Sequence, residues 1–140
     1  MDSIRSVLGF DFGLKRIGVA SGQTITATAS PLVTIETTED DSHFDDIMAL
    51  IRRWKPDRLL VGIPYMLDGS ATEMSTLARK FGEQIAQRSG LEVSFVDETL
   101  SSAEAEEILK QRLQLGKHNK SEVDRMAAAI IVQSWLDQHT

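Results

Sequence analysis

The residue types best suited to chemistry in this sequence are three acids that lie far apart along the chain, Asp11, Glu98 and Asp124. Carboxylate oxygens are the ligands that Mg²⁺ and Mn²⁺ prefer in proteins. A pair of such ions can activate an attacking water and stabilise the leaving oxygen of a phosphodiester. If the fold brings the three acids together, the sequence therefore predicts a metal site suited to phosphodiester hydrolysis.

Asp11 lies within an apolar segment, residues 6–12, that has the pattern of a β-strand. Alternation along a strand directs its side chain to the face opposite that of Phe10. Aspartate is unfavourable in strands, and a buried carboxylate without a partner is costly, so Asp11 needs a cation or hydrogen-bond donors. An ion pair with Lys15 or Arg16 in the following turn would satisfy it as well as a metal ion would.

Glu98 follows a predicted strand, residues 91–96, and so stands at the carboxyl end of that strand, where ligand sites of open α/β sheets gather. Alternation directs the neighbouring Asp97 the other way, so we expect only Glu98 to face the site. The simpler alternative is that both acids begin a loop.

Asp124 falls in the first turn of the last predicted helix. An acid there would form a cap with Ser121 and would interact favourably with the helix dipole. The segment that follows, residues 126–132, is apolar throughout, so the helix should be buried. Asp124 would then be held close to the sheet, which keeps a role in the site open beside the capping role.

Composition limits the classes of protein to consider. The chain has 140 residues, 41% of them hydrophobic and 26% charged, which predicts one soluble domain over residues 1–140. There is no cysteine, so thiolate metal sites and a cysteine nucleophile are excluded, and a reducing cytoplasm is compatible with the sequence. The net charge of −6 is the wrong sign for nonspecific coating of DNA. Nucleic acid would have to be bound through a local basic surface or through metal cations, which reverse the local field.

The elements that must position the acids follow from periodicity. Residues 6–12, 17–23 and 28–35 are short strand-like segments separated by short turns, which favours an antiparallel meander. An acidic stretch, residues 36–46, then leads into an amphipathic helix that Pro56 ends. Residues 58–63 form a predicted buried strand.

The remainder of the chain alternates between helix and strand. Ser70 with Glu73 predicts a capping box at the start of a helix that Gly90 ends. After the strand at residues 91–96, Ser101 with Glu104 predicts a further helix. A polar loop at residues 116–120 precedes the last helix.

This order predicts an α/β fold: a mixed five-stranded sheet, with three antiparallel strands followed by parallel β-α-β units, and helices on both faces. A ribonuclease H-like architecture has this order, and a flavodoxin-like sheet with a hairpin extension would give a similar one.

Several motifs together resemble those of the YqgF/RuvX family. They are the segment Gly-Phe-Asp-Phe-Gly-Leu-Lys-Arg-Ile-Gly-Val-Ala at residues 9–20, the Val-Gly-Ile-Pro of residues 61–64 with the Asp-Gly-Ser of residues 68–70, the segment at residues 96–105, and Lys120 with Asp124 before an alanine-rich helix. The resemblance runs from about residue 5 to about residue 137, in order and at family spacing.

The resemblance implies a ribonuclease H-like fold and a nuclease that depends on Mg²⁺ or Mn²⁺. The family is described both as a Holliday junction resolvase, by likeness to the RuvC resolvases, and as the nuclease that matures the 5′ end of 16S rRNA. Its acidic catalytic and metal-binding positions match Asp11, Glu98 and Asp124. One departure is Thr99, where family members commonly carry arginine, which weakens the case for a phosphate contact there.

The expected partner is nucleic acid, either pre-rRNA within a ribosomal particle or branched DNA, bound by a monomer or weak homodimer. The candidate contacts are the cations near the acids, namely Lys15, Arg16, Lys117 and Lys120. The acidic balance favours an rRNA substrate. A sugar-kinase-like phosphate loop is a poorer interpretation, because such enzymes need two domains and no phosphate-binding GxxxxGK[ST] motif is present. A non-catalytic assembly factor remains the main alternative.

Overall fold

A five-stranded mixed sheet forms the centre of the molecule. The computed structural model describes residues 4–66, 68–98 and 120–139. The strands are β1 (Ser6–Phe12), β2 (Arg16–Gln23), β3 (Thr28–Glu36), β4 (Arg58–Ile63) and β5 (Val93–Asp97), in the spatial order β3-β2-β1-β4-β5. β1, β2 and β3 pair antiparallel, whereas β4 pairs parallel to both β1 and β5. The predicted mixed sheet is confirmed.

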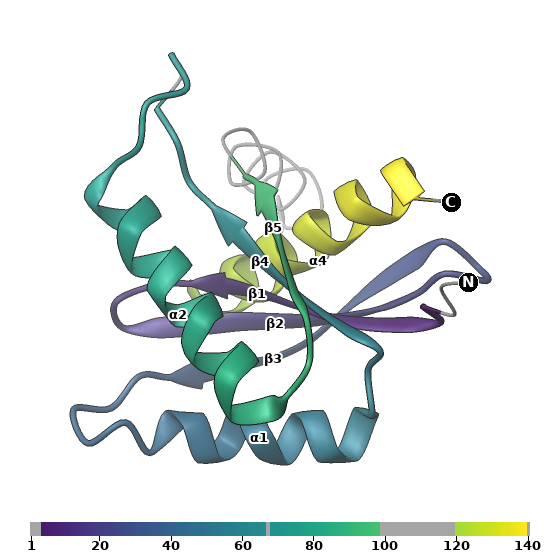
Figure 1. Ribbon diagram of the computed structural model, residues 1–140, viewed down its shortest axis with the longest axis horizontal. Coiled ribbons are helices and arrows are strands. Elements are labelled where there is room, and N and C mark those ends of the chain that lie inside the picture. The colour runs from purple at the N-terminus through teal and green to yellow at the C-terminus, as the bar shows by residue number, and fades with distance from the viewer. Residues whose placement is uncertain (1–3, 67, 99–119, 140) are drawn as a thin grey trace, which may run out of the picture.

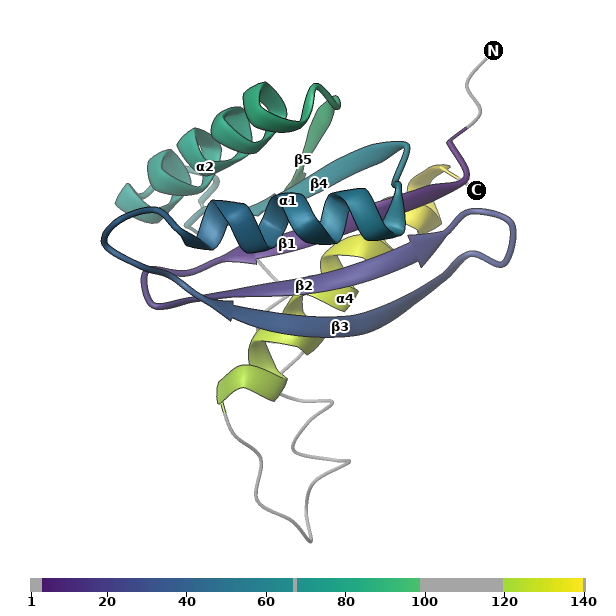
Figure 2. The same ribbon diagram turned by 90° about the horizontal axis from the view of Figure 1, so that it is seen from below.

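The helices divide between the two faces of this sheet (Figures 1 and 2). α1 (His43–Trp54) and α2 (Glu73–Ser89) cover one face, and α4 (Lys120–His139) covers the other. Figure 2 shows α1 and α4 on opposite sides of the strands. Helices on both faces were predicted, and the arrangement is confirmed.

Alternation along β1 assigns its side chains to two separate cores. Leu8 and Phe10 are fully buried with residues of α1 and α2, while Val7 packs in a second cluster with α4. The face that carries Val7 and Asp11 is therefore the face covered by α4. The sequence predicted this division of β1 side chains between two faces, and the structure shows which helices cover each face.

Two helix boundaries follow local chemistry. Lys55 ends α1 in the left-handed conformation (φ 48°), and its N–H donates to the carbonyl of Ile51, one residue before the expected stop at Pro56. Gly90 ends α2 with φ 75°, a conformation that glycine adopts without a Cβ clash.

The predicted capping box at Ser70 and Glu73 is wrong. Ser70 donates from both its backbone N–H and its hydroxyl to the carboxylate of Asp68, so it belongs to the turn before the helix. Thr72 is the cap of α2 instead: its hydroxyl oxygen accepts from the N–H of Ser75, and the Ser75 hydroxyl accepts from the N–H of Thr72.

Two other boundaries also differ from expectation. The strand predicted at residues 91–96 is formed by Val93–Asp97, and the next residue, Glu98, still donates its N–H to the carbonyl of Ile63 at 3.0 Å. α4 already includes Lys120, so Ser121 lies within the helix and is not its cap. The helix predicted from Ser101 and residues 116–119 of the predicted loop at 116–120 lie outside the described residues, and the last residue of that loop, Lys120, is helical. None of the helices described is both long enough and apolar enough to span a lipid bilayer.

Candidate functional site

Asp11 and Glu98 form a hydrogen-bonded pair of carboxyl groups on the α4 side of the sheet. Asp11 is half-buried near the end of β1, and Glu98 directly follows β5. β4 lies between these two strands, and all three run parallel, so their carboxyl ends meet at one edge. The structure thus brings together two of the three predicted acids.

Glu98 is more deeply buried than its place after a strand suggested, with a relative exposure of 5%. Its Oε2 atom has no hydrogen-bond partner among residues 4–66, 68–98 and 120–139. The side chain fits against β4 because position 62 is glycine: a Cβ there would lie 2.8 Å from Oε2 of Glu98. The adjacent Asp97 is exposed, as strand alternation predicts.

Asp11 and Glu98 are neighbouring acids with little access to water, and this raises the pKa of both. The pKa of Glu98 is raised to about 9, chiefly by burial and then by the nearby charge of Asp11 and the hydrogen bond with it. Burial also raises the pKa of Asp11 to about 6, with the hydrogen bond to Glu98 opposing that rise and the charge of Asp124 adding to it. Without a cation, the pair therefore retains a proton at neutral pH.

Asp124 reaches the same region from α4. A Cβ at Gly18 would lie 2.0 Å from the carbonyl oxygen of Asp124, so the first turn of α4 sits directly on β2 at this glycine. Gly18 is also the residue that pairs with Asp11 across β1 and β2. Asp124 is thus placed beside Asp11 by a close approach that only glycine permits.

The carboxylate of Asp124 is engaged by a cation of the chain itself. Arg16 donates from Nε to Oδ2 of Asp124 at 2.7 Å, and both side chains are partly exposed. This pair answers two alternatives left open by the sequence. Arg16 pairs with Asp124 and not with Asp11, and Asp124 is held by that ion pair within a helix that Ser121 does not cap.

The three acids do not yet form a closed metal site. In the part of the chain that the structure describes, no group of three or more His, Cys, Asp or Glu side chains is arranged to hold a metal ion. What is present is a pair of carboxyl groups in which the buried Glu98 has an unpartnered oxygen, and a third carboxylate turned to Arg16. An oxygen-only donor set with an unsatisfied buried oxygen fits a hard divalent cation such as Mg²⁺.

The predicted nucleic-acid contacts have different outcomes. Lys15 is exposed in the turn between β1 and β2, while Arg16 is occupied by Asp124. Lys117 lies outside the described residues, and Lys120 begins α4. These four roles stay predictions.

Two residues that position the site were not singled out from the sequence, Gly18 and Gly62. Each lies in a strand that is otherwise buried and apolar, which is the available signal, because glycine inside a strand often marks a close approach.

Comparison with known proteins places the chain in a family. The family described as "RuvX: Holliday junction resolvase" matches residues 5–138. A curated relative from Dechloromonas aromatica is 45% identical over 132 residues, covering 94% of this chain and 90% of the relative. A relative from Methylobacillus flagellatus is 47% identical, with coverage of 94% and 90%. Both carry the name "Putative pre-16S rRNA nuclease".

Solved structures share the fold at low sequence identity. RuvC of T. thermophilus in complex with Holliday junction substrate superposes with a TM-score of 0.58 at 16% identity, covering 96% of this chain and 95% of that one. The fowlpox virus resolvase, also solved with Holliday junction DNA, gives a TM-score of 0.61 at 11% identity, with coverage of 96% and 98%. This likeness establishes the ribonuclease H-like fold.

Proposed function

The chain belongs to the RuvX family, and on that premise we propose that it is a hydrolase that cuts phosphodiester bonds in nucleic acid. The observation that carries the proposal is the hydrogen-bonded pair of half-buried Asp11 and buried Glu98, with Oε2 of Glu98 lacking a partner among the described residues. Such a pair is unfavourable for stability and has a clear use as a ligand set.

Asp11 and Glu98 would hold a divalent cation, Mg²⁺ or Mn²⁺, and Asp124 would complete the set. The cation would supply Lewis-acid activation of water and stabilisation of the leaving oxygen. The chain's own residues prepare the site. Asp11 and Glu98 hold a proton between their carboxyl groups until they serve as ligands, and Arg16 orients the Asp124 carboxylate beside them.

Lysine side chains would then place the substrate. Lys15 stands in the turn that follows Asp11, so its ammonium group can contact a phosphate next to the one being cut. We assign the same task to Lys117 and Lys120, which precede Asp124 in the sequence. Arg16 is available to phosphate only where it gives up its ion pair with Asp124.

For the substrate, we propose precursor 16S rRNA, cut during maturation of its 5′ end. The names of the curated relatives support this choice, as does a net charge of −6, which suits a discrete processing site better than a wrapped duplex. The second candidate is a four-way DNA junction, favoured by the description of the family and by the junction complexes of its structural neighbours. An rRNA substrate would place the protein in the cytoplasm with ribosomal particles, as one nuclease domain over residues 1–140 in a monomer or weak homodimer.

The test is a side-by-side cleavage assay on a precursor 16S rRNA fragment and on a four-way junction, each with Mg²⁺ or Mn²⁺ and with EDTA. The wild type should cut the rRNA in the presence of metal, whereas Asp11→Asn and Glu98→Gln should not. Asp97→Asn is the matched control, because Asp97 is the exposed neighbour of Glu98. Equal cleavage by wild type and Asp11→Asn would refute the assignment of the acids. A protein that binds both substrates and cuts neither would be an assembly factor without catalysis.

A further inference from the structure

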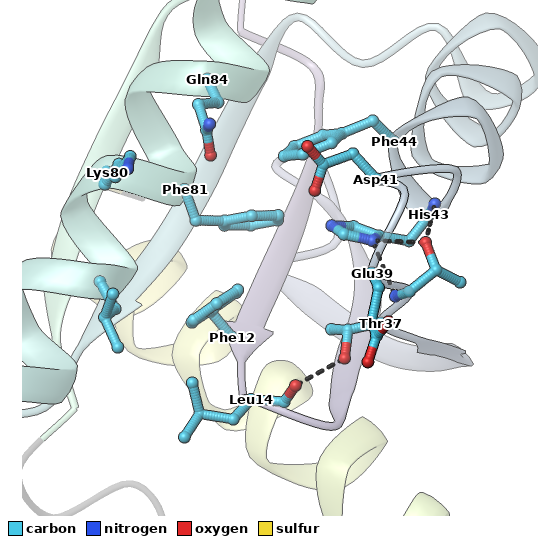
Figure 3. A pocket seen from close by; sticks show the side chains of 12 residues that line it. Phe12, Leu14, Thr37, Glu39, Asp41, His43, Phe44, Lys80, Phe81 and Gln84 are labelled. Carbon is cyan, nitrogen blue, oxygen red and sulfur yellow. Dashed lines mark hydrogen bonds between the residues drawn. The ribbon is translucent and has the colours of Figure 1, made fainter.

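A cavity of about 420 Å³ opens on the face of the sheet opposite the acids (Figure 3). It lies between the end of β1, the segment that leads into α1, and α2. Asp11 faces α4, and the next residue, Phe12, faces the other way and lines this cavity. Its size is within the range of small-molecule sites.

One wall of the cavity is apolar and suited to a flat ring. The Phe12 ring stacks on Phe81 with centroids 4.9 Å apart and is itself only partly buried. Leu14 lines the same side and is 65% exposed. The Leu14 turn is held in place by Thr37, whose hydroxyl donates to the Leu14 carbonyl at 2.5 Å. Partly exposed aromatic rings can stack nucleobases in proteins that bind unpaired strands.

A buried histidine presents a hydrogen-bond donor to the cavity. His43 is 6% exposed, and its Nδ1 accepts from the backbone N–H of Thr38 at 3.1 Å. An imidazole nitrogen that accepts carries no hydrogen, so in the neutral ring the hydrogen is on Nε2. Figure 3 shows the His43 ring directed into the cavity. The inner wall therefore offers an N–H group next to the apolar surface.

The charged side chains at the rim favour binding of a nucleotide over binding of a simple anion. Lys80 of α2 stands across the opening from Glu39 and Asp41. Two carboxylates against one ammonium group make the rim a poor site for phosphate alone. The same carboxylates are good acceptors for the N–H groups of a base, and Lys80 can pair with the phosphate attached to it.

We propose that this cavity binds one unpaired nucleotide of the substrate strand. The base lies against Phe12 and Leu14, its N–H groups meet Glu39 and Asp41, and its phosphate meets Lys80. Guanine fits best because its pairing edge, with N1–H and the 2-amino group, presents more N–H donors than that of the other bases. The inference rests on the proposed function in one respect, that the substrate is nucleic acid.

The position of the cavity indicates how a bound nucleotide would affect cleavage. Asp11 and Phe12 are consecutive, so their Cα atoms are about 3.8 Å apart, yet their side chains serve opposite faces of the sheet. A strand that crosses the turn between β1 and β2 would therefore place a base in the cavity within a short distance of the phosphate at the acids. The bound base would fix which bond reaches Asp11 and Glu98.

The first experiment measures binding without catalysis. Guanosine 5′-monophosphate is titrated into the ¹⁵N-labelled wild-type chain in EDTA, and backbone and histidine side-chain resonances are followed by NMR. Saturable shifts are expected at Leu14, Thr38 and Lys80 and at the His43 ring. Ribose 5-phosphate, which lacks the base, should shift them at least tenfold more weakly.

Variants locate the site. Lys80→Glu and Leu14→Ser should each weaken the affinity for the nucleotide by about tenfold, in line with the loss of one stacked or paired group. Arg52→Glu is the matched control, because it makes the same charge change at an exposed position near the end of α1, away from the cavity. Thermal melting of each variant verifies that the fold is retained. An equal loss in Arg52→Glu would attribute the effect to net charge and overturn the proposal.

Two further results would also overturn it: no saturable shift at the cavity residues, or an equal response to ribose 5-phosphate. Because the titration is done in EDTA, its outcome is separate from the cleavage assay. Cleavage without nucleotide shifts would remove this inference and leave the nuclease function standing, whereas nucleotide shifts without cleavage would do the reverse.

Discussion

The fold keeps the Glu98 carboxyl group protonated at pH values where it would ionise in the unfolded chain. Replacing Glu98 with glutamine removes this ionisable group. The pKa of Glu98 is raised from 4.5 to about 9, chiefly by burial and secondly by the charge of Asp11. The unfolded chain ionises this group near its usual value, so above that pH the unfolded state loses a proton that the folded state keeps. The contribution of Glu98 to folding is thus most favourable below pH 4.5 and declines as the pH rises towards about 9.

The magnitude follows from the same shift. Neutral pH lies about 2.5 units above the usual pKa of 4.5, and each unit corresponds to about 1.4 kcal/mol, so Glu98 costs the metal-free protein roughly 3 kcal/mol at pH 7. Glutamine keeps the size of the side chain and cannot ionise. We expect Glu98→Gln to unfold at a higher urea concentration than wild type at pH 7 in EDTA, by roughly 2–3 kcal/mol. The difference should shrink towards zero near pH 4.

Urea denaturation in EDTA, repeated across this pH range, measures the effect. Glu83→Gln is the control, because Glu83 is an exposed glutamate of α2 and should show no such pH dependence. Adding Mg²⁺ should stabilise wild type more than Glu98→Gln, since a cation that binds the folded state shifts the equilibrium towards it. Parallel pH profiles for wild type and Glu98→Gln would refute the account of a buried, strained carboxyl pair.

Three further predictions test other parts of the site and fold. Gly18→Ala should lower the free energy of unfolding by about 2–4 kcal/mol, because its Cβ would lie 2.0 Å from a backbone oxygen of α4; a variant as stable as wild type would contradict this contact. Arg16→Gln should raise Mg²⁺ affinity in isothermal titration by about three- to tenfold, because it removes a cation that competes for Asp124, whereas Lys15→Gln should change it less; an unchanged affinity would mean that the ion pair does not oppose the metal. Thr72→Ala should cost about 1 kcal/mol in urea denaturation and Ser70→Ala much less, and the reverse order would restore Ser70 as the cap of α2.

Much of the architecture could be predicted from local sequence patterns. The strands at residues 6–12 and 58–63 have the bounds predicted for them, and Gly90 ends α2 as expected, because period-2 apolar alternation and a left-handed glycine are properties of a few neighbouring residues. The residues at which helices start were harder to predict. Ser70, Thr72 and Ser75 all have the chemistry of a cap, and hydrogen bonding of Ser70 to Asp68 decides against the first of them.

Only part of the site could be predicted from the sequence. The face of Asp11 and the outward direction of Asp97 follow from alternation along their strands, so both were predictable. Whether Arg16 pairs with Asp11 or with Asp124 was not predictable, because Arg16 and Asp124 are separated by 108 positions in sequence. Similarly, the unpartnered oxygen of Glu98 depends on how closely Gly62 lets it approach β4.

By itself, the sequence determined the order of the elements, the two faces of β1 and the membership of the chain in the RuvX family, and it indicated Asp11, Glu98 and Asp124 as the candidate acids. Only the tertiary structure decided which of those acids meet. Asp11 and Glu98 share a hydrogen bond because parallel strands end at one edge, and Asp124 is held at Arg16 because α4 packs directly on Gly18. Local periodicity specifies the direction of a side chain, whereas its partner and its exposure to water depend on the packing of segments far apart in the chain.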